Sequence, residues 1–275
     1  MCTGSPSLAR IVAVFLLLSI AACSSSATRP PVIEQVRPEL EKYFQGFNGA
    51  FVFYDLDDNR YIRYNPEGCT ERLLPASTFK IMNALVALET GVVEDQNDVI
   101  SWDGTQFPIS VWNQDHTLKT AFQDSVVWYY QELARRIGRE RMQHYIDAVE
   151  YGNQNLGPNV DSFWLDGSLQ ISADEQVEFL KRLYQGDLPF SKRSIEIVRD
   201  IMILESDPAH QLSGKTGSGQ MGNLSIGWFV GYEEKKGNVY FFALNITSSS
   251  PEANGSKARG ILLEILRDET ILDIE

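Results

Sequence analysis

The amino-acid sequence predicts an α/β (α+β) fold: a central antiparallel sheet built from both chain ends and flanked by helices, with an adjoining all-helical subdomain. Three observations predict it. A strand hairpin lies near the start of the chain, a second hairpin lies near its end, and helical patterns fill most of the stretch between them. Strands from both ends can then pair in one sheet, with the helical subdomain, roughly residues 92–190, inserted beside it.

The two hairpins are marked by composition and by turn residues. Residues 49–56 and 60–64 are rich in aromatic and apolar side chains and flank the turn sequence Asp-Asp-Asn. Near the end of the chain, residues 225–232 and 239–247 are apolar, aromatic and β-branched, and the polar stretch 233–238 joins them. We therefore expect each pair to form antiparallel strands.

Helical segments are marked by apolar periodicity and by their start and stop residues. Pro75 and Gly91 bracket the first segment, Gly138 ends the second, and Ser172 with Glu175 forms a capping box before another. We expect helices over residues 76–89, 121–137, 139–150, 172–184 and 255–271.

Residues 1–22 predict a secretory signal, because a basic residue precedes the short apolar run 11–20 and small residues follow it. The run is too short for a stable membrane span. The sequence Ile-Ala-Ala-Cys, which ends at Cys23, resembles a bacterial lipoprotein cleavage box with lipidation of Cys23; an ordinary signal peptide cleaved nearby is the alternative. We expect an exported, periplasmic protein, with a tether over 23–32, one catalytic domain over 33–275, and membrane contact only through that lipid anchor.

Composition excludes several classes of partner. The formal net charge is −13, so nucleic acid and anionic lipid surfaces would be repelled, and no basic cluster opposes this. No CxxC motif or Cys/His cluster is present, and His116, His144 and His210 are scattered along the chain. We therefore expect no metal, and the sequence leaves the oligomeric state open.

The sharpest local motif is Ser-Thr-Phe-Lys at residues 77–80. Ser77 falls in the first turn of the predicted helix, and Lys80 lies three residues later on the same face. A serine hydroxyl needs a base to become a nucleophile, and burial lowers a lysine pKa enough for a neutral amine to act as that base. Such a pair also occurs by chance, so it predicts nucleophilic catalysis only with further support.

A second motif precedes the last hairpin. Lys215, Thr216 and Gly217 place a cation, a hydroxyl and a glycine on a predicted edge strand. This combination suits a substrate carboxylate, because the cation and hydroxyl can bind it and glycine allows close approach. The alternative is a glycine-broken strand start with an exposed lysine.

Together the two motifs form the serine acyl-transfer pairing of penicillin-binding proteins and β-lactamases. Ser-Val-Val at residues 125–127 and Tyr-Gly-Asn at 151–153 lie between them in the expected order. With these four ordered motifs the chain resembles the class D (oxacillinase-type) serine β-lactamases over essentially its whole length after the signal.

The resemblance implies a chemical role for each of several residues. Carbon dioxide or bicarbonate would carboxylate Lys80, and the resulting carbamate would be the general base for Ser77 and then for water. Trp164 would hydrogen-bond this carbamate, although a core indole has the same spacing. Ser125 would relay protons, and Val127 would keep the carbamate dry. No other cofactor is implied, and no Glu-x-x-Leu-Asn segment supplies another base.

The resemblance also assigns the binding residues. Arg259 would pair with the substrate carboxylate, although a cation on a helix face is the alternative. The backbone N–H groups of Ser77 and Ser218 would form the oxyanion hole. Many members of the family have an aromatic residue where this chain has Ser218. The serine removes a possible wall over the substrate, so the sequence leaves the range of substrates open. Tyr151 and Asn153 would support the cleft.

The predicted function is therefore hydrolysis of the β-lactam amide of penicillin-type antibiotics through an acyl-enzyme on Ser77, the small-molecule β-lactam being the partner. Three alternatives remain. The chain could be a β-lactam-sensing or penicillin-binding protein that is acylated without efficient turnover, a D,D-peptidase, or a related fold with little activity. Trp164 and the Ser-x-Val motif argue against the peptidase, because the resemblance links both to the mechanism that uses a carboxylated lysine.

Overall fold

The structure is a computed structural model of the chain and describes residues 1–4 and 31–268. Cys23 and nearly all of the predicted signal and tether lie outside the described residues. All the strands and helices of the described residues lie within 31–268, which belong to one compact unit.

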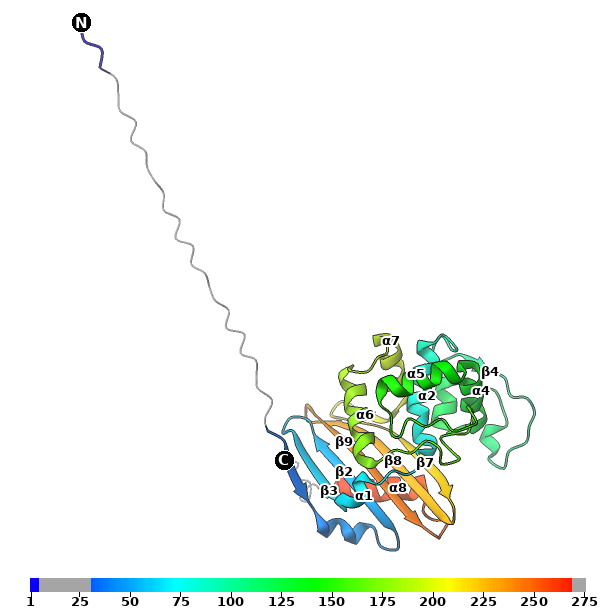
Figure 1. The fold of residues 1–275 in the computed structure, drawn as a ribbon. Helices are drawn as coiled ribbons and strands as arrows, with labels where there is room; N and C mark the ends of the chain where they lie inside the picture. Colours follow the sequence, from blue (N-terminus) through cyan, green and yellow to red (C-terminus); the bar gives the residue numbers. More distant parts are fainter. Residues whose placement is uncertain (5–30, 269–275) are drawn as a thin grey trace. The chain divides into compact units, whose positions relative to one another are not determined.

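A seven-stranded sheet carries the fold (Figure 1), in the spatial order β1-β3-β2-β9-β8-β7-β6. Every neighbouring pair is antiparallel except β1 and β3, which are parallel. Both predicted hairpins are confirmed, and strands from both ends of the chain meet where β2 pairs with β9. The strands are β1 Ile33–Val36, β2 Asn48–Asp55, β3 Arg60–Tyr64, β6 Ile203–Asp207, β7 His210–Met221, β8 Leu224–Lys235 and β9 Asn238–Ser248.

Two details of the sheet differ from the sequence expectation. The turn between β8 and β9 is only Lys236 and Gly237, both with positive φ, as a tight two-residue hairpin requires. The Lys-Thr-Gly strand is not the edge strand, because β6 lies outside it. However, β6 pairs only with the stretch from His210 to Ser213, so Lys215 lies beyond its end.

Helices cover both faces of the sheet. On β2, Phe51 and Phe53 pack in one core with helix α8 (Gly255–Arg267), whereas Val52 and Tyr54 pack in the other core with helix α6 (Ala173–Gln185). This alternation follows from the two-residue period of a strand. All four side chains are buried, so neither face of the central strands is open to solvent.

The chain between β3 and β6 contains the other α-helices, which lie with α6 on the side of the sheet opposite α8 (Figure 1). A short two-stranded ladder of β4 and β5 lies among them. These elements are α1 Pro66–Thr70, α2 Lys80–Glu89, α3 Leu118–Gln123, α4 Val127–Ile137, α5 Arg139–Val149, α7 Lys192–Ile201, β4 Val99–Ile100 and β5 His116–Thr117, with the 3-10 helices η1 Pro38–Tyr43, η2 Ala76–Phe79 and η3 Ser110–Trp112.

Three predicted helices differ from the observed ones. The helix over 76–89 begins as the 3-10 turn η2, so Ser77 lies in that turn and α2 starts at Lys80. The helix over 121–137 is interrupted, because Ser125 has φ of 55° and separates α3 from α4. The last helix, predicted to 271, ends at Arg267.

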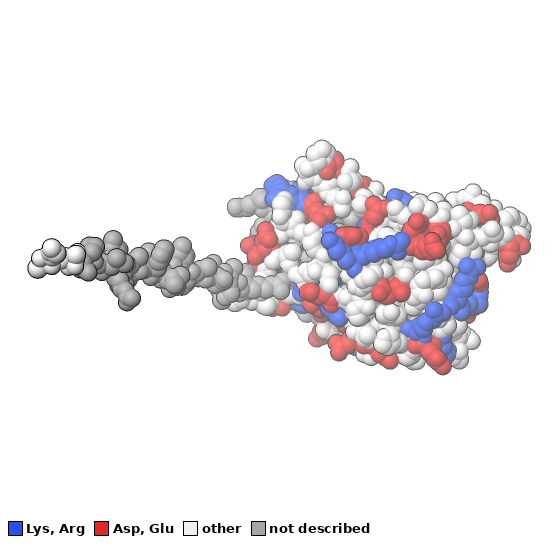
Figure 2. Space-filling view, turned by 90° about the horizontal axis from the view of Figure 1, so that it is seen from above, with Lys and Arg blue, Asp and Glu red and all other residues white. Residues whose placement is uncertain are grey.

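Among the described residues no helix is long and apolar enough to cross a membrane. On the face shown in Figure 2, acidic side chains adjoin most of the basic ones, so the negative net charge does not form a surface of one sign there.

Candidate active site

The predicted nucleophile and its base are in direct contact. Ser77 Oγ and Lys80 Nζ are hydrogen-bonded at 2.6 Å. The turn η2 leads straight into α2, so residues three apart lie on one face and their side chains meet. Ser77 is 8% exposed and Lys80 1% exposed, so the serine reaches the surface while the amine does not.

Burial decides the charge of Lys80. It lowers the pKa of the amine well below its usual range, and the charge of Lys215 lowers it further. The amine lies 5.3 Å from the centre of the Tyr130 ring, and among the described residues no carboxylate acts on its pKa. Asn83 fastens α2 to α4 through the carbonyl of Tyr130, at 3.1 Å. The site therefore favours a neutral, nucleophilic amine at neutral pH.

A second hydrogen-bonded pair lies beside the first. Lys215 Nζ donates to Ser125 Oγ at 3.1 Å and to the carbonyl of Thr216 at 3.1 Å. Burial lowers the pKa of Lys215 to about 7. Ser125 is half-buried, and Val127, two residues later, is half-buried at the start of α4. The pair can pass a proton between a bound ligand and the site.

The Lys-Thr-Gly strand packs closely against the nucleophile turn. A Cβ on Gly217 would lie 2.9 Å from the carbonyl oxygen of Pro75 and 3.1 Å from Thr78 Cγ2. Glycine is therefore needed for β7 to approach η2, a requirement of the protein itself beyond the ligand approach inferred from the sequence. This packing places Ser77 and Ser218 on the two facing segments, as an oxyanion hole made of their N–H groups requires.

Trp164 lies next to the nucleophile turn. Its ring stacks on Phe79 with centroids 5.4 Å apart, and its carbonyl accepts a hydrogen bond from Ala76 N at 3.1 Å. The side chain is fully buried, and its Nε1 donor has no hydrogen-bond partner among the described residues. The hydroxyl of Tyr130 is likewise buried and unpartnered there. Buried donors without a partner would be satisfied by an additional acceptor group beside them.

The Tyr-Gly-Asn motif holds the loop that carries Trp164. Asn153 Nδ2 donates to the carbonyl of Ser168 at 2.8 Å, and Asn153 Oδ1 accepts from Gln170 N at 3.0 Å. Tyr151 is buried, and its ring contacts Phe79 edge-on at 5.7 Å. Both residues thus act on the position of the Trp164 loop.

Arg259 lies near Lys215, and the side chain of Ser218 is bonded to helix α8. With Lys215 and Thr216, Arg259 lines a small cavity of about 100 Å³, although Arg259 Nη2 also pairs with Glu205 at 2.9 Å. Ser218 Oγ accepts from Gly255 N at 2.9 Å, so this side chain is bonded to the first turn of α8. The sequence does not predict this hydrogen bond, because Ser218 and Gly255 are far apart in the chain.

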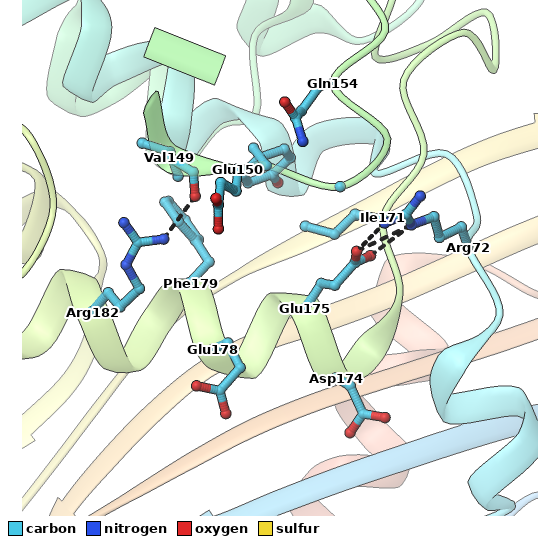
Figure 3. Close-up of a pocket in the computed structure, with 12 residues that line it drawn as sticks. Arg72, Val149, Glu150, Gln154, Ile171, Asp174, Glu175, Glu178, Phe179 and Arg182 are labelled. Carbon is cyan, nitrogen blue, oxygen red and sulfur yellow. Dashed lines mark hydrogen bonds and ion pairs between the residues drawn. The ribbon is translucent and has the colours of Figure 1, made fainter. Parts of the chain in front are cut away.

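A further cavity lies away from the Ser77 and Lys80 pair. A pocket of about 420 Å³ lies on the outer side of Tyr151 and α6, and Ser77 and Lys80 do not line it. Figure 3 shows Arg72 paired with Glu175 at one end and Arg182 bonded to the carbonyl of Val149 at the other. Within residues 1–4 and 31–268 no group of three or more His, Cys, Asp or Glu residues is arranged to hold a metal ion.

Comparison with known proteins assigns the family. A family model described as the penicillin-binding protein transpeptidase domain matches residues 48–267. The chain is 42% identical over 224 residues to β-lactamase OXA-48 of Klebsiella pneumoniae, covering 82% of this chain and 84% of that protein. It is also 42% identical over 231 residues to the regulatory protein BlaR1 of Bacillus licheniformis, covering 83% of this chain but only 38% of BlaR1.

A solved structure shows the same fold. The crystal structure of a class D β-lactamase from Sebaldella termitidis matches with a TM-score of 0.83 at 39% identity, covering 88% of this chain and 99% of that one. The four motifs, the contact of Ser77 with Lys80 and these matches agree. The chain therefore belongs to the penicillin-binding protein transpeptidase domain family and, within it, to the class D serine β-lactamase family.

Proposed function

We propose that the chain is a class D β-lactamase that hydrolyses the β-lactam amide of penicillin-type antibiotics through an acyl-enzyme on Ser77, with carboxylated Lys80 as general base. The observation that carries the proposal is the contact of Ser77 Oγ with a buried, neutral Lys80 at 2.6 Å. The β-lactamases at 36–42% identity support it.

The residues around Lys80 fit a carbamate. Carbon dioxide reacts with a neutral amine, which burial provides here. The unpartnered Nε1 of Trp164 and the hydroxyl of Tyr130 are buried donors that suit an anionic acceptor. When present, the carbamate supplies the general base that Ser77 and the hydrolytic water both need.

The other residues act on the substrate. Ser77 Oγ attacks the lactam carbonyl carbon, and the N–H groups of Ser77 and Ser218 hold the developing oxyanion. The carbonyl–nitrogen bond breaks, and Ser125, bonded to Lys215, delivers a proton to the nitrogen. Lys215 and Arg259 bind the substrate carboxylate. Water then cleaves the Ser77 ester and releases the ring-opened acid.

A sensor is the second candidate function. The match to BlaR1, described as a regulatory protein, is as high in identity as the match to OXA-48. A sensor would form the same ester on Ser77 and keep it. The two functions differ in deacylation, for which an active general base at Lys80 is needed.

We further propose that the protein is exported and lipid-anchored at Cys23. The signal pattern over residues 1–22 supports this. Labelling with a radioactive or alkyne-bearing fatty acid, compared between the wild type and Cys23→Ser, tests it; equal labelling of both would contradict it.

The test of the function is hydrolysis of a chromogenic cephalosporin by the purified protein, with and without added bicarbonate. Sustained turnover that bicarbonate stimulates is expected, and Ser77→Ala should be inactive. A single stoichiometric burst, unchanged by bicarbonate and accompanied by a stable adduct on Ser77, would support the sensor instead.

A further inference from the structure

The backbone at Ser125 is in a conformation that serine seldom adopts. Its φ is 55°, in the left-handed region. Val126 N donates to the carbonyl of Ala121 at 2.9 Å and Ser125 N to that of Phe122 at 3.2 Å, which is the hydrogen-bond pattern of a Schellman helix end. Glycine usually occupies this position. A serine stays there only when the surrounding structure holds it.

Trp112, in η3, supplies such support from outside the helix. Its Nε1 donates to the carbonyl of Asp124 at 3.0 Å, directly before Ser125. The carbonyl of Trp112 in turn accepts from Trp128 Nε1 at 2.8 Å, in the first turn of α4. Trp112 is therefore hydrogen-bonded on both sides of Ser125, to Asp124 before it and to Trp128 after it.

The loop that carries Trp112 is itself anchored. His116 is 2% exposed, and its two ring nitrogens bond the carbonyl of Val111 at 2.9 Å and Thr120 Oγ1 at 3.1 Å. Its ring also lies 6.0 Å from that of Trp128. The support of the Ser125 turn thus extends into the core of the helical part.

We propose that Trp112 and Trp128 are positioning residues that hold Ser125 Oγ within reach of Lys215 Nζ, and so set the rate of acylation. The inference rests on the proposed function for its kinetic consequence, because Ser125 is taken to deliver the proton to the leaving nitrogen. A displacement of the hydroxyl by about 1 Å would lengthen its 3.1 Å bond to Lys215 and slow that step.

The variants Trp112→Phe and Trp128→Phe test this, because phenylalanine keeps an apolar ring and removes the N–H donor. Trp102→Phe is the matched control: Trp102 Nε1 donates to the carbonyl of Thr105 at 2.8 Å, within its own loop and not to the Ser125 segment. Acylation and deacylation are measured separately by stopped flow with a fluorescent penicillin.

Each positioning variant should lower the acylation rate constant about tenfold and leave deacylation within about twofold. The double variant should lose little more than either single one, because both act on one turn. Unchanged acylation, or equal losses in acylation and deacylation, would overturn the proposal. So would an equal effect of Trp102→Phe.

Hydrogen exchange separates this proposal from the proposed function. Amide exchange over residues 121–128, followed by mass spectrometry, should become faster in both positioning variants and remain unchanged in Trp102→Phe. If the wild type is not acylated at all, the proposed function fails, and the exchange result still decides whether the two tryptophans hold the turn. Unchanged exchange over this segment would contradict the positioning role.

Discussion

The two walls of the active site each contribute a buried lysine, and the two lysines differ in charge. Lys80, on the helical wall, is bonded to Ser77 Oγ, and burial lowers its pKa well below the usual range. Lys215, on the sheet wall, has a pKa lowered to about 7 and is bonded to a hydroxyl and a carbonyl. Burial thus lowers the pKa of both amines, but to different extents. Lys80 is neutral at neutral pH and suited to become a base, whereas Lys215 is protonated below about pH 7 and is suited there to bind a carboxylate.

The walls also differ in backbone regularity. On the sheet wall, β7 pairs with β8 without interruption from His210 to Met221. On the helical wall, Ala76 and Ser125 both have positive φ, at 47° and 55°. Strained residues persist where surrounding contacts hold them, and they concentrate at active sites. Under the proposed function, the helical wall would carry the reactive groups, and the sheet wall would provide a regular surface for the ligand.

The largest effect should come from Ser77→Ala, which removes the nucleophile. Hydrolysis should fall by at least about 10⁴-fold, because no other group can form the acyl-enzyme. Intact-protein mass spectrometry with a penicillin should show no adduct. Ser206→Ala, on the exposed strand β6, is the control and should form the adduct normally. An adduct on the Ser77→Ala protein would contradict the assignment.

Lys80→Ala should have the next largest effect. Turnover should fall by about 10³-fold, since the general base is lost from both steps. Any acyl-enzyme that forms should persist, and its lifetime can be followed by mass spectrometry. Lys192→Ala, an exposed lysine that pairs only across its own helix with Glu196, should behave as the wild type. Rapid turnover by the Lys80→Ala protein would refute the role of the lysine.

Trp164→Phe sharpens the comparison by removing one donor from the helical wall. Turnover should fall about 10- to 100-fold, because the carbamate loses a hydrogen bond and is retained less well. Added bicarbonate should restore part of the activity by mass action. Trp102→Phe should show no such dependence. If bicarbonate has no effect on the Trp164→Phe protein, Trp164 Nε1 does not hydrogen-bond a carbamate on Lys80.

The lowered pKa of Lys215 predicts how substrate binding depends on pH. Its amine is protonated below about pH 7 and loses its proton as the pH rises through that value. For a penicillin, kcat/KM should therefore decline by about tenfold above pH 7 as the charged partner of the carboxylate is lost. The same profile measured on Lys215→Met should lack this decline. A wild-type profile that stays flat to pH 9 would contradict the assignment.

The smallest effect is expected at Gly152, which supports the Trp164 loop. Its φ is +54°, and a Cβ there would lie 2.1 Å from the carbonyl oxygen of Gln170. Gly186 also has positive φ, at +77°, but nothing lies within 4 Å of its Cβ position. Gly152→Ala should lower the free energy of unfolding by about 1–3 kcal/mol more than Gly186→Ala. If urea denaturation shows the same loss of unfolding free energy for both variants, the close contact of the Cβ with Gln170 does not destabilise the fold.

Local sequence patterns predicted those structural features that depend on residues close together in the sequence. The hairpin of β2 and β3, the capping box at Ser172 and the contact of Ser77 with Lys80 all follow from short spacings. In contrast, no glycine marks the break at Ser125, so periodicity alone predicted a continuous helix there.

Contacts between distant segments could not be predicted from periodicity. The bonds of Trp112 to Asp124 and of Ser218 to Gly255 join segments that only the folded chain brings together. The parallel pairing of β1 with β3 is of the same kind. The sequence therefore predicts candidate reactive residues, whereas the hydrogen bonds that hold them in place become visible only in three dimensions.

The most direct test of the central claim is ¹³C NMR of the protein in ¹³C-labelled bicarbonate. A carbamate resonance is expected for the wild type; it should be absent from Lys80→Ala and remain in Lys192→Ala. Its intensity should fall as the pH is lowered and Lys80 becomes protonated. No carbamate signal in a wild-type protein that still turns over β-lactams would contradict the account, because another group would then have to serve as the base.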